Sequence, residues 1–310
     1  MIIGSVDKTA ETQEAKGLTF CFFRVINRGI TGTEEKKVGK NTKILFTDLD
    51  GTLLNDEKEV TAGNQAAIDR ALEQGHKIVV TTGRPLASGL DIAERIGLTK
   101  EGCYVIAFNG GQIYDPFHKK TIYGKTFSKE VAKPLFQEAM DRGLHIQSYS
   151  DTQVLSLKEN RELLFYISGT TVSYKIVPDL ESAFPNDPYK ILLVGLDNRA
   201  ELDRYQEECV NPLKGTVRGF FSTENFLEIV PDGVSKGVAV KWLCEYLDIP
   251  LENSVAAGDA PNDVEMLQAA YVGAVMKNAY EGMDRYATYV TERDNNHDGV
   301  AEIIEKFILR

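Results

Sequence analysis

Two aspartates, Asp48 and Asp50, stand directly after the run ILFT, which has the composition of a buried strand. Residues two apart along a strand point to the same face, so the two carboxylates leave the strand side by side. Like charges at such a distance require a cation or a proton between them. A bare Asp-Gly pair after a strand is more often a simple turn. The full string DLDGTLL at residues 48–54 favours a functional site instead.

Three further apolar runs also end in polar residues. The runs HKIVVTT, CYVIAFN and SVAAGD close with Thr82, Asn109 and Asp259. In parallel α/β sheets, ligands bind beyond the carboxyl ends of the strands. The sequence therefore predicts a single site to which these strand ends and Asp48 contribute.

Short apolar runs alternate with amphipathic segments from Lys43 onward, a pattern typical of βαβ units. A first helix is predicted between a capping Thr61 and a terminating Gly75. Its apolar residues at helical spacing are Ala66, Ala67, Ala71 and Leu72. A second helix is predicted over about residues 85–96, closed by Gly97. The predicted fold class is α/β, with a doubly wound, mainly parallel sheet.

The alternation of short apolar runs with amphipathic segments changes after Tyr114. This change predicts an inserted α+β lobe. Its expected elements are a helix at 129–141, polar strands, the run KILLVGL, a helix at 199–209 and strands through about residue 221. The doubly wound pattern is expected to resume with LEIV at 227–230 and to continue through three more helices. The predicted division is a core of residues 43–124 and 224–310, an inserted lobe of 125–223 and an N-terminal extension of 1–42.

Length and composition agree with this organisation. A chain of 310 residues exceeds the usual size of one hydrophobic core. A net charge of −11 makes nucleic acid a poor partner. The four cysteines lack CxxC spacing, so neither a zinc site nor a disulfide framework is indicated. No apolar run reaches the roughly 18 residues of a membrane span and no signal-peptide pattern is present, so we expect a cytoplasmic protein without a membrane partner.

Four motifs together resemble the haloacid dehalogenase (HAD) superfamily, and within it the Cof-type phosphatases with an α/β cap inserted after the third core strand. They are DLDGTLL at 48–54, TTGRP at 81–85, Lys236 in VSKG, and GDAPNDVEML at 258–267. The resemblance covers the chain from about Lys43 to its C-terminus. It implies a Rossmann-like core, a C2B-type cap and a phosphatase that acts on a small phosphorylated metabolite.

The resemblance also implies roles for the motif residues. Asp48 would attack phosphorus and form an aspartyl-phosphate, and Asp50 would act as general acid and then general base. Thr82 and Lys236 would contact the phosphoryl group, and Lys236 would begin a helix whose first amides face it. The implied cofactor is Mg²⁺, an ion that prefers oxygen ligands. Its implied ligands are Asp48, the main-chain carbonyl of Asp50, Asp259 and Asp263, where Asp263 would hold either Lys236 or a metal-bound water.

Further phosphate or substrate contacts are implied for Leu49, Gly83, Arg84, Asn109, Gly110 and Asn262. A tight hairpin turn explains Asn109 and Gly110 equally well. Asn278 and the segment 294–301 match closing motifs of the family, whereas Lys277 stands where the family more often has a small residue. No histidine has metal-binding spacing. A contact between His145 and the substrate is an open alternative.

Several other functions compete with a phosphatase. A phosphoacceptor receiver module also uses Asp, Thr and Lys at strand ends, but there an acidic pair precedes the acceptor on an earlier strand. A non-catalytic phosphometabolite-binding protein is disfavoured because Asp48 and Asp50 are both present. A phosphomutase of the phosphomannomutase type is the closest rival among enzymes. Sugar phosphates are the leading substrate expectation, followed by flavin mononucleotide and pyridoxal phosphate, and the oligomeric state is open.

Overall fold

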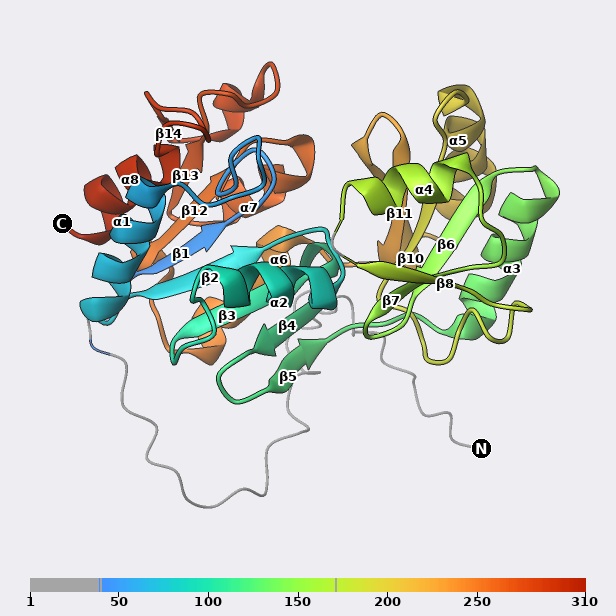
Figure 1. Ribbon diagram of the computed structural model, residues 1–310, viewed down its shortest axis with the longest axis horizontal. Helices are drawn as coiled ribbons and strands as arrows, with labels where there is room; N and C mark the ends of the chain where they lie inside the picture. The colour runs from blue at the N-terminus through green and yellow to red at the C-terminus, as the bar shows by residue number, and fades with distance from the viewer. Residues whose placement is uncertain (1–38, 40, 171) are drawn as a thin grey trace, which may run out of the picture. The chain divides into compact units, whose positions relative to one another are not determined.

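The structure is a computed structural model that describes residues 39, 41–170 and 172–310. Most of the predicted N-terminal extension therefore lies outside the described residues. From residue 41 onward the chain forms one sheet of eight strands and another of six (Figure 1). None of the helices in these ranges is long and apolar enough to cross a membrane.

The eight-stranded sheet confirms the predicted α/β class. Its strand order is β14-β13-β12-β1-β2-β3-β4-β5, and the pairs from β14 to β3 are all parallel. Two antiparallel strands, β4 and β5, extend the edge beyond β3. The strands are β1 Ile44–Thr47, β2 Lys77–Thr81, β3 Cys103–Ala107, β4 Gln112–Asp115, β5 Lys120–Gly124, β12 Ser254–Gly258, β13 Val272–Val275 and β14 Tyr289–Val290.

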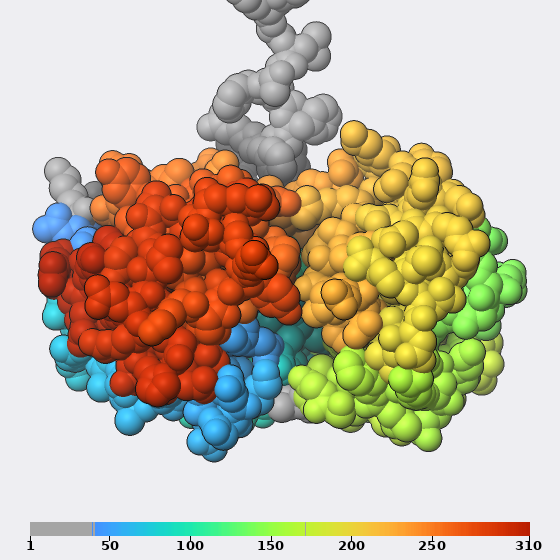
Figure 2. All heavy atoms as spheres, turned by 90° about the horizontal axis from the view of Figure 1, so that it is seen from above, coloured from blue at the N-terminus to red at the C-terminus, as the bar shows by residue number. Residues whose placement is uncertain are grey.

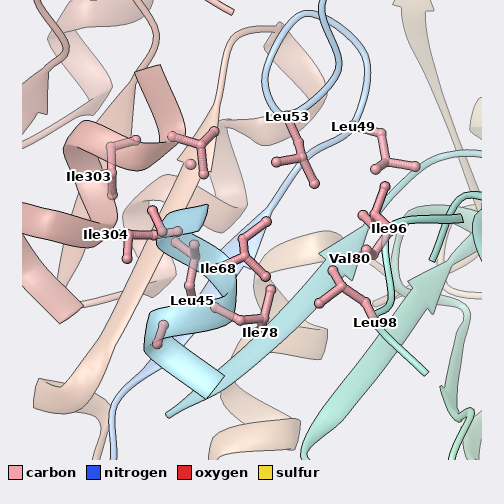
Figure 3. Close-up of a cluster of buried hydrophobic side chains, with 14 of the residues drawn as sticks. Leu45, Leu49, Leu53, Ile68, Ile78, Val80, Ile96, Leu98, Ile303 and Ile304 are labelled. Atoms are coloured by element: carbon pink, nitrogen blue, oxygen red, sulfur yellow. The ribbon is translucent and has the colours of Figure 1, made fainter. Parts of the chain in front are cut away.

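Helices cover both faces of this sheet because consecutive strand residues point to opposite sides. On one face Leu45 and Ile78 pack against α1, α2 and α8, as the buried cluster of Figure 3 shows. On the other face Phe46 and Val79 pack against α6 and α7. The helices are α1 Ala62–Glu73, α2 Leu86–Arg95, α6 Lys236–Tyr246, α7 Val264–Ala269 and α8 Gly299–Ile303. The predicted doubly wound arrangement is thus confirmed.

The limits of α1 follow from its sequence. The Thr61 hydroxyl accepts a hydrogen bond from the Asn64 amide, as expected of an N-cap. Gly75 has a φ of 82°, the left-handed conformation that a glycine adopts after a helix. The expected apolar face was partly wrong, because Ala66 is exposed and the buried side includes Ile68.

The six-stranded sheet, with the helices that pack on it, is here called the cap. Its order is β10-β11-β9-β6-β7-β8. Helices α3 and α5 pack on one face and α4 on the other. The strands are β6 His145–Tyr149, β7 Gln153–Ser156, β8 Ser173–Ile176, β9 Ile191–Val194, β10 Val217–Thr223 and β11 Phe226–Pro231; the helices are α3 Lys129–Asp141, α4 Arg161–Ser168 and α5 Arg199–Tyr205.

One strand that was expected in the core sheet lies in the cap sheet instead. The run LEIV, predicted to resume the core at residues 227–230, forms most of β11 and pairs antiparallel with β9 and β10 of the cap. The prediction that the core resumes at residue 224 is therefore wrong for this strand. The doubly wound pattern resumes with α6, after Pro231.

Shorter helical turns connect these elements. The 3-10 turns are Phe108–Gly110, Asn211–Leu213, Leu251–Asn253, Pro261–Asp263 and Met283–Tyr286, and single π turns follow α5 at Gln206–Val210 and α8 at Ile304–Ile308. The last of these lies beside the start of β1, where the Lys43 ammonium donates to the Phe307 carbonyl at 2.7 Å. Figure 2 shows the corresponding blue and red ends of the described chain on one side of the molecule.

Candidate active site

Four adjacent strands bring the predicted site residues to one edge of the core sheet. The strands β12, β1, β2 and β3 are neighbours in this order, and all four run parallel. Asp259, Asp48 and Thr82 directly follow β12, β1 and β2, and Asn109 follows β3 by two residues. All four residues are at least nine-tenths buried. The sheet topology therefore gathers them at a single site.

Lys236 lies at the centre of this group. Its ammonium donates to Asp48 Oδ1 at 2.5 Å and to Asp263 Oδ1 at 2.6 Å. Burial opposes the charge on Lys236, but Asp263 and Asp48 outweigh it and raise the pKa of the amine. Ser235 caps α6 by accepting from the Val238 amide, so Lys236 occupies the first position of the helix.

Asp263 is held from both sides. Its Oδ1 accepts from Lys236, while Oδ2 accepts from the backbone amides of Asp259 and Ala260 at 3.1 Å each. These contacts leave its side chain fully buried with both oxygens engaged. The contact with Lys236 is one of the two that the sequence predicted for Asp263.

Asp259 faces Asp48 from the neighbouring strand. Thr52, for which the sequence predicted no role, donates its hydroxyl to Asp259 Oδ1 at 2.7 Å. Its only sequence signal was its place within the string DLDGTLL. Gly51 has a φ of 77°, and a Cβ there would lie 2.6 Å from Asp259 Oδ2. This close approach brings the backbone after Asp50 against the Asp259 carboxylate.

The donor set fits a hard divalent cation. Carboxylate oxygens of Asp48, Asp259 and Asp263 lie within 4.8 Å of one another, beside the single ammonium of Lys236. Burial, and then Asp263, raise the pKa of Asp259 to about 7. Burial also raises the pKa of Asp48 well above its usual range, although Lys236 opposes the shift. With all three carboxyl groups ionised, the cluster would carry more negative charge than Lys236 balances, and a bound cation would stabilise that form. Its oxygen ligands suit Mg²⁺.

Asp50 points to a different set of partners. Its carboxylate receives two hydrogen bonds from the Arg84 guanidinium, and Lys58 donates to Oδ1 at 2.9 Å. Burial alone would raise the pKa of Asp50, but the hydrogen bonds from Arg84 and Lys58 lower it below its usual value. Asp50 is thus a paired carboxylate, two residues from Asp48.

The loop after β2 contains three predicted residues. The Thr82 hydroxyl accepts from the Arg84 amide at 3.1 Å, which orders the turn. The Gly83 carbonyl accepts from the ammonium of Lys190, a cap residue that no sequence motif marked, at 2.8 Å. A Cβ on Gly83 would lie 2.9 Å from Asn109 Oδ1, so glycine permits this loop to approach the next strand end.

Asn109 and Gly110 form the turn between β3 and β4 and also lie beside Lys236. Asn109 has a φ of 56° and Gly110 one of 101°. A Cβ on Gly110 would lie 2.2 Å from the Ser235 carbonyl, immediately before Lys236. Asn109 Oδ1 accepts from Asn262 at 3.5 Å. The predicted hairpin turn is present, and it lies beside Lys236.

The remaining predicted residues take different positions. The Leu49 side chain is fully buried in the core of Figure 3, which leaves only its main-chain groups for a ligand. Asn278 donates to the Gly51 carbonyl at 2.8 Å and so lies next to the site. His145 is buried in the cap sheet with Nε2 3.1 Å from Gln147 Oε1.

Comparisons with known proteins show the family to which the chain is similar. The family model described as haloacid dehalogenase-like hydrolase matches residues 45–304. The phosphatase YwpJ of Bacillus subtilis is 30% identical over 296 residues, with 86% of this chain and 100% of that protein covered. A second B. subtilis relative, the 5-amino-6-(5-phospho-D-ribitylamino)uracil phosphatase YwtE, is 28% identical, with coverage of 86% and 98%.

A solved structure supports the same assignment. The crystal structure of a haloacid dehalogenase-like hydrolase from Bacteroides thetaiotaomicron superposes with a TM-score of 0.80 at 29% identity, over 86% of this chain and 99% of that one. The match includes nearly the whole of the solved chain. This chain belongs to the haloacid dehalogenase-like hydrolases, as a phosphatase enzyme of that family.

Proposed function

We propose that the chain hydrolyses small phosphomonoesters with Mg²⁺ through an aspartyl-phosphate on Asp48. The observation that carries this proposal is the contact of Lys236 with both Asp48 and Asp263, beside Asp259, at the carboxyl ends of adjacent strands. The close contact of these residues supports Asp48 as a nucleophile, Lys236 as its compensating cation and the carboxylates as a metal site. It fits attack by a carboxylate on an anionic phosphoryl group.

Asp48 is the proposed nucleophile. Its attack on phosphorus displaces the alkoxide and forms an acyl phosphate, which water then cleaves to release phosphate and restore the carboxylate. Phosphate monoesters are among the slowest substrates to hydrolyse unaided, with enzymatic accelerations of up to about 10²¹, so two easier displacements are an advantage. The Lys236 ammonium at 2.5 Å offsets the repulsion between the Asp48 carboxylate and the phosphoryl oxygens.

Asp50 is the proposed proton carrier. In the first displacement it gives a proton to the departing alkoxide, and in the second it takes one from the attacking water. Arg84 and Lys58 hold Asp50 as a carboxylate, the form that the second displacement requires. For the first displacement these contacts must loosen when substrate binds, so that the carboxyl group can carry its proton.

Mg²⁺ would be held by side-chain oxygens of Asp48 and Asp259 and by the main-chain carbonyl of Asp50. When bound, it supplies positive charge that stabilises the phosphoryl oxygens in the transition state. Asp263 supports this arrangement by holding Lys236 and the backbone that follows β12. Thr52 fixes the orientation of Asp259 through its hydroxyl.

Sugar phosphates and related polyol phosphates are the proposed substrates. The relative YwtE is named for 5-amino-6-(5-phospho-D-ribitylamino)uracil, whose phosphate is on a ribityl chain. Family resemblance supports the same class. Thr82, Gly83, Asn109, Gly110 and Asn262 are the proposed contacts for the phosphoryl group and the adjacent substrate atoms.

Hydrolysis of p-nitrophenyl phosphate with and without Mg²⁺ tests the proposal. We expect metal-dependent turnover that Asp48→Asn abolishes and that Asp69→Asn, on helix α1 away from the strand ends, leaves intact. Equal rates for Asp48→Asn and the unmodified protein would rule out Asp48 as the nucleophile. Turnover that persists after chelation and dialysis would rule out the dependence on Mg²⁺.

A further inference from the structure

The turn after β3 has two successive non-glycine residues in the left-handed backbone region. Phe108 has a φ of 51° and Asn109 one of 56°. Asparagine adopts this region fairly often, whereas a bulky residue such as phenylalanine is a rare exception there. A residue in such a conformation keeps it only when the surrounding structure imposes it. The contacts of Phe108 therefore decide whether this turn is maintained.

The cap supplies the ring contacts that enclose Phe108. Tyr189, two residues before β9, stacks on the Phe108 ring with the centroids 5.3 Å apart and the planes at 13°. Tyr149, the last residue of β6, meets the same ring edge-on at 5.8 Å and 68°. Both geometries are favourable for aromatic pairs. Phe108 is only 4% exposed, so two rings of the cap hold a residue of the core.

The backbone of the same turn is bonded to the loop after β2. The Phe108 amide donates to the Arg84 carbonyl at 3.0 Å, and the Asn109 amide donates to the Thr82 carbonyl at 3.1 Å. Asn109 Nδ2 is buried and has no acceptor among the residues that the structure describes. Buried donors normally have acceptors, and an oxygen of a bound phosphoryl group would provide one. The conformation of Phe108 thus fixes the position of a donor that is open to the substrate.

Lys190 contacts the loop after β2 from the same segment of the cap. Its ammonium donates to the Gly83 carbonyl at 2.8 Å and lies 5.0 Å from the centroid of the Tyr149 ring. Tyr189 and Lys190 are consecutive, so one cap segment contacts both the turn after β3 and the loop after β2. The cap is thereby held against two of the strand ends that form the candidate active site.

We propose that Tyr189 is a positioning residue for the phosphatase reaction, which keeps Phe108 in its left-handed conformation and so directs Asn109 at the phosphoryl group. Without the stacked ring, Phe108 relaxes to the negative φ that its type prefers, and Asn109 shifts with it because the two residues are consecutive. The role rests on the proposed function, in which Asn109 contacts the phosphoryl group, and extends that function to a residue of the cap.

Replacement of the stacked ring tests this role. Tyr189→Leu should lower kcat/KM for p-nitrophenyl phosphate about tenfold to a hundredfold, the range expected when a positioning contact shifts by about 1 Å. Tyr189→Phe keeps the ring and should stay within about twofold of the unmodified protein. Tyr271→Leu is the matched control, since Tyr271 is 66% exposed and precedes β13, at the end of that strand opposite to the site.

A double-substitution cycle separates positioning from a loss of stability. Asn109→Ala should lower kcat/KM about as much as Tyr189→Leu does, and Tyr189→Leu should then add less than about twofold in the Asn109→Ala protein. A merely structural role would cost the same factor with and without the Asn109 side chain. Thermal melts check folding. If Tyr189→Leu does not fold, Phe108→Leu removes the other ring of the stack and takes its place in the cycle.

Turnover by the unmodified protein and by Asp48→Asn, measured in parallel, separates the two levels of the account. An unchanged kcat/KM in Tyr189→Leu, or an equal loss with and without the Asn109 side chain, would overturn this inference alone while turnover still depends on Asp48. Absence of turnover in the unmodified protein, or full turnover in Asp48→Asn, would overturn the proposed function and the inference with it.

Discussion

Both carboxylate oxygens of Asp50 accept hydrogen bonds from the guanidinium of Arg84, Oδ2 from Nε and Oδ1 from Nη2, each at 2.7 Å. This two-point contact fixes the plane of the carboxylate as well as its charge. Arg84 is thereby linked to Asp50 rather than to the cluster around Asp48. We infer that Arg84 positions the proton carrier.

If Arg84 acts through Asp50, the effects of replacing the two residues are not additive. Asp50→Asn is expected to lower kcat by about 10²–10⁴, the usual contribution of general acid–base catalysis. Arg84→Met alone should lower kcat by about tenfold or more, but should have little further effect in the Asp50→Asn protein. Steady-state kinetics of the four proteins measures the coupling. Arg95→Met, at the end of the helix α2 that follows Arg84, is the control. Fully additive losses would contradict the inferred role of Arg84.

Gly110 is expected to tolerate no side chain. Gly110→Ala combines a φ of 101° with a Cβ 2.2 Å from the Ser235 carbonyl, next to Lys236. We expect a loss of about 1–3 kcal/mol in the free energy of unfolding and a reduced kcat, measured by urea denaturation and aryl phosphate hydrolysis. Gly75→Ala is the matched control, since its φ is 82° but no atom lies within 4 Å of the added Cβ. Equal losses in both variants would show that the contact with Ser235 has no effect.

The buried pair of Lys190 and Glu228 links the cap to the loop after β2. Only 2% and 6% of these side chains are exposed, so Lys190→Met leaves a buried carboxylate without its cation. We expect a loss of about 3–5 kcal/mol in the free energy of unfolding. The double change Lys190→Met with Glu228→Gln should recover much of it, because the unpaired charge is gone. Urea denaturation tests this, and a double variant no more stable than Lys190→Met would argue against charge burial as the cause.

The stability of the protein is expected to fall in mildly acidic solution in part because of His145. Burial lowers the pKa of this imidazole, and the Gln147 contact opposes the shift only in part. In the unfolded chain the same group takes up a proton near pH 6.5. The unfolded state therefore binds more protons as the pH falls below about 6.5, so the free energy of unfolding decreases until the folded protein is protonated too.

His145→Gln should flatten this dependence. The measurement is urea denaturation at several values between about pH 7.5 and about pH 5, with the slope of free energy against pH compared between the two proteins. The comparison of slopes is independent of any constant difference in stability caused by the substitution. Identical slopes would show that His145 makes no contribution to the acid sensitivity.

The parts of the fold that sequence predicted best are those governed by local rules. Thr61 and Gly75 delimit α1 because capping and the left-handed glycine depend on neighbouring residues alone. The strand that ends before Asp48 was equally clear, because a short apolar run followed by turn residues is typical of a central strand, and its four residues are all buried. Such local signals fixed the edge of the sheet at which the site residues gather.

The assignment of LEIV failed because an apolar run does not specify its neighbours. Pairing of β11 with β9 and β10 depends on residues distant in sequence. The same limit hid Lys190 and Arg218, single cations whose partners Gly83 and Glu265 lie more than 40 residues away. Contacts between cap and core therefore emerge only from the three-dimensional structure.

Direct detection of the phosphorylated enzyme tests the central claim. The Asp50→Asn protein should form the acyl phosphate from p-nitrophenyl phosphate and Mg²⁺ but hydrolyse it slowly, because it lacks the base for the second displacement. After rapid acid quenching and proteolysis, mass spectrometry should locate one phosphoryl group on Asp48, and Asp48→Asn in the same background should show none. A phosphoryl group on another residue, or turnover by Asp50→Asn without any phosphorylated enzyme, would contradict the account.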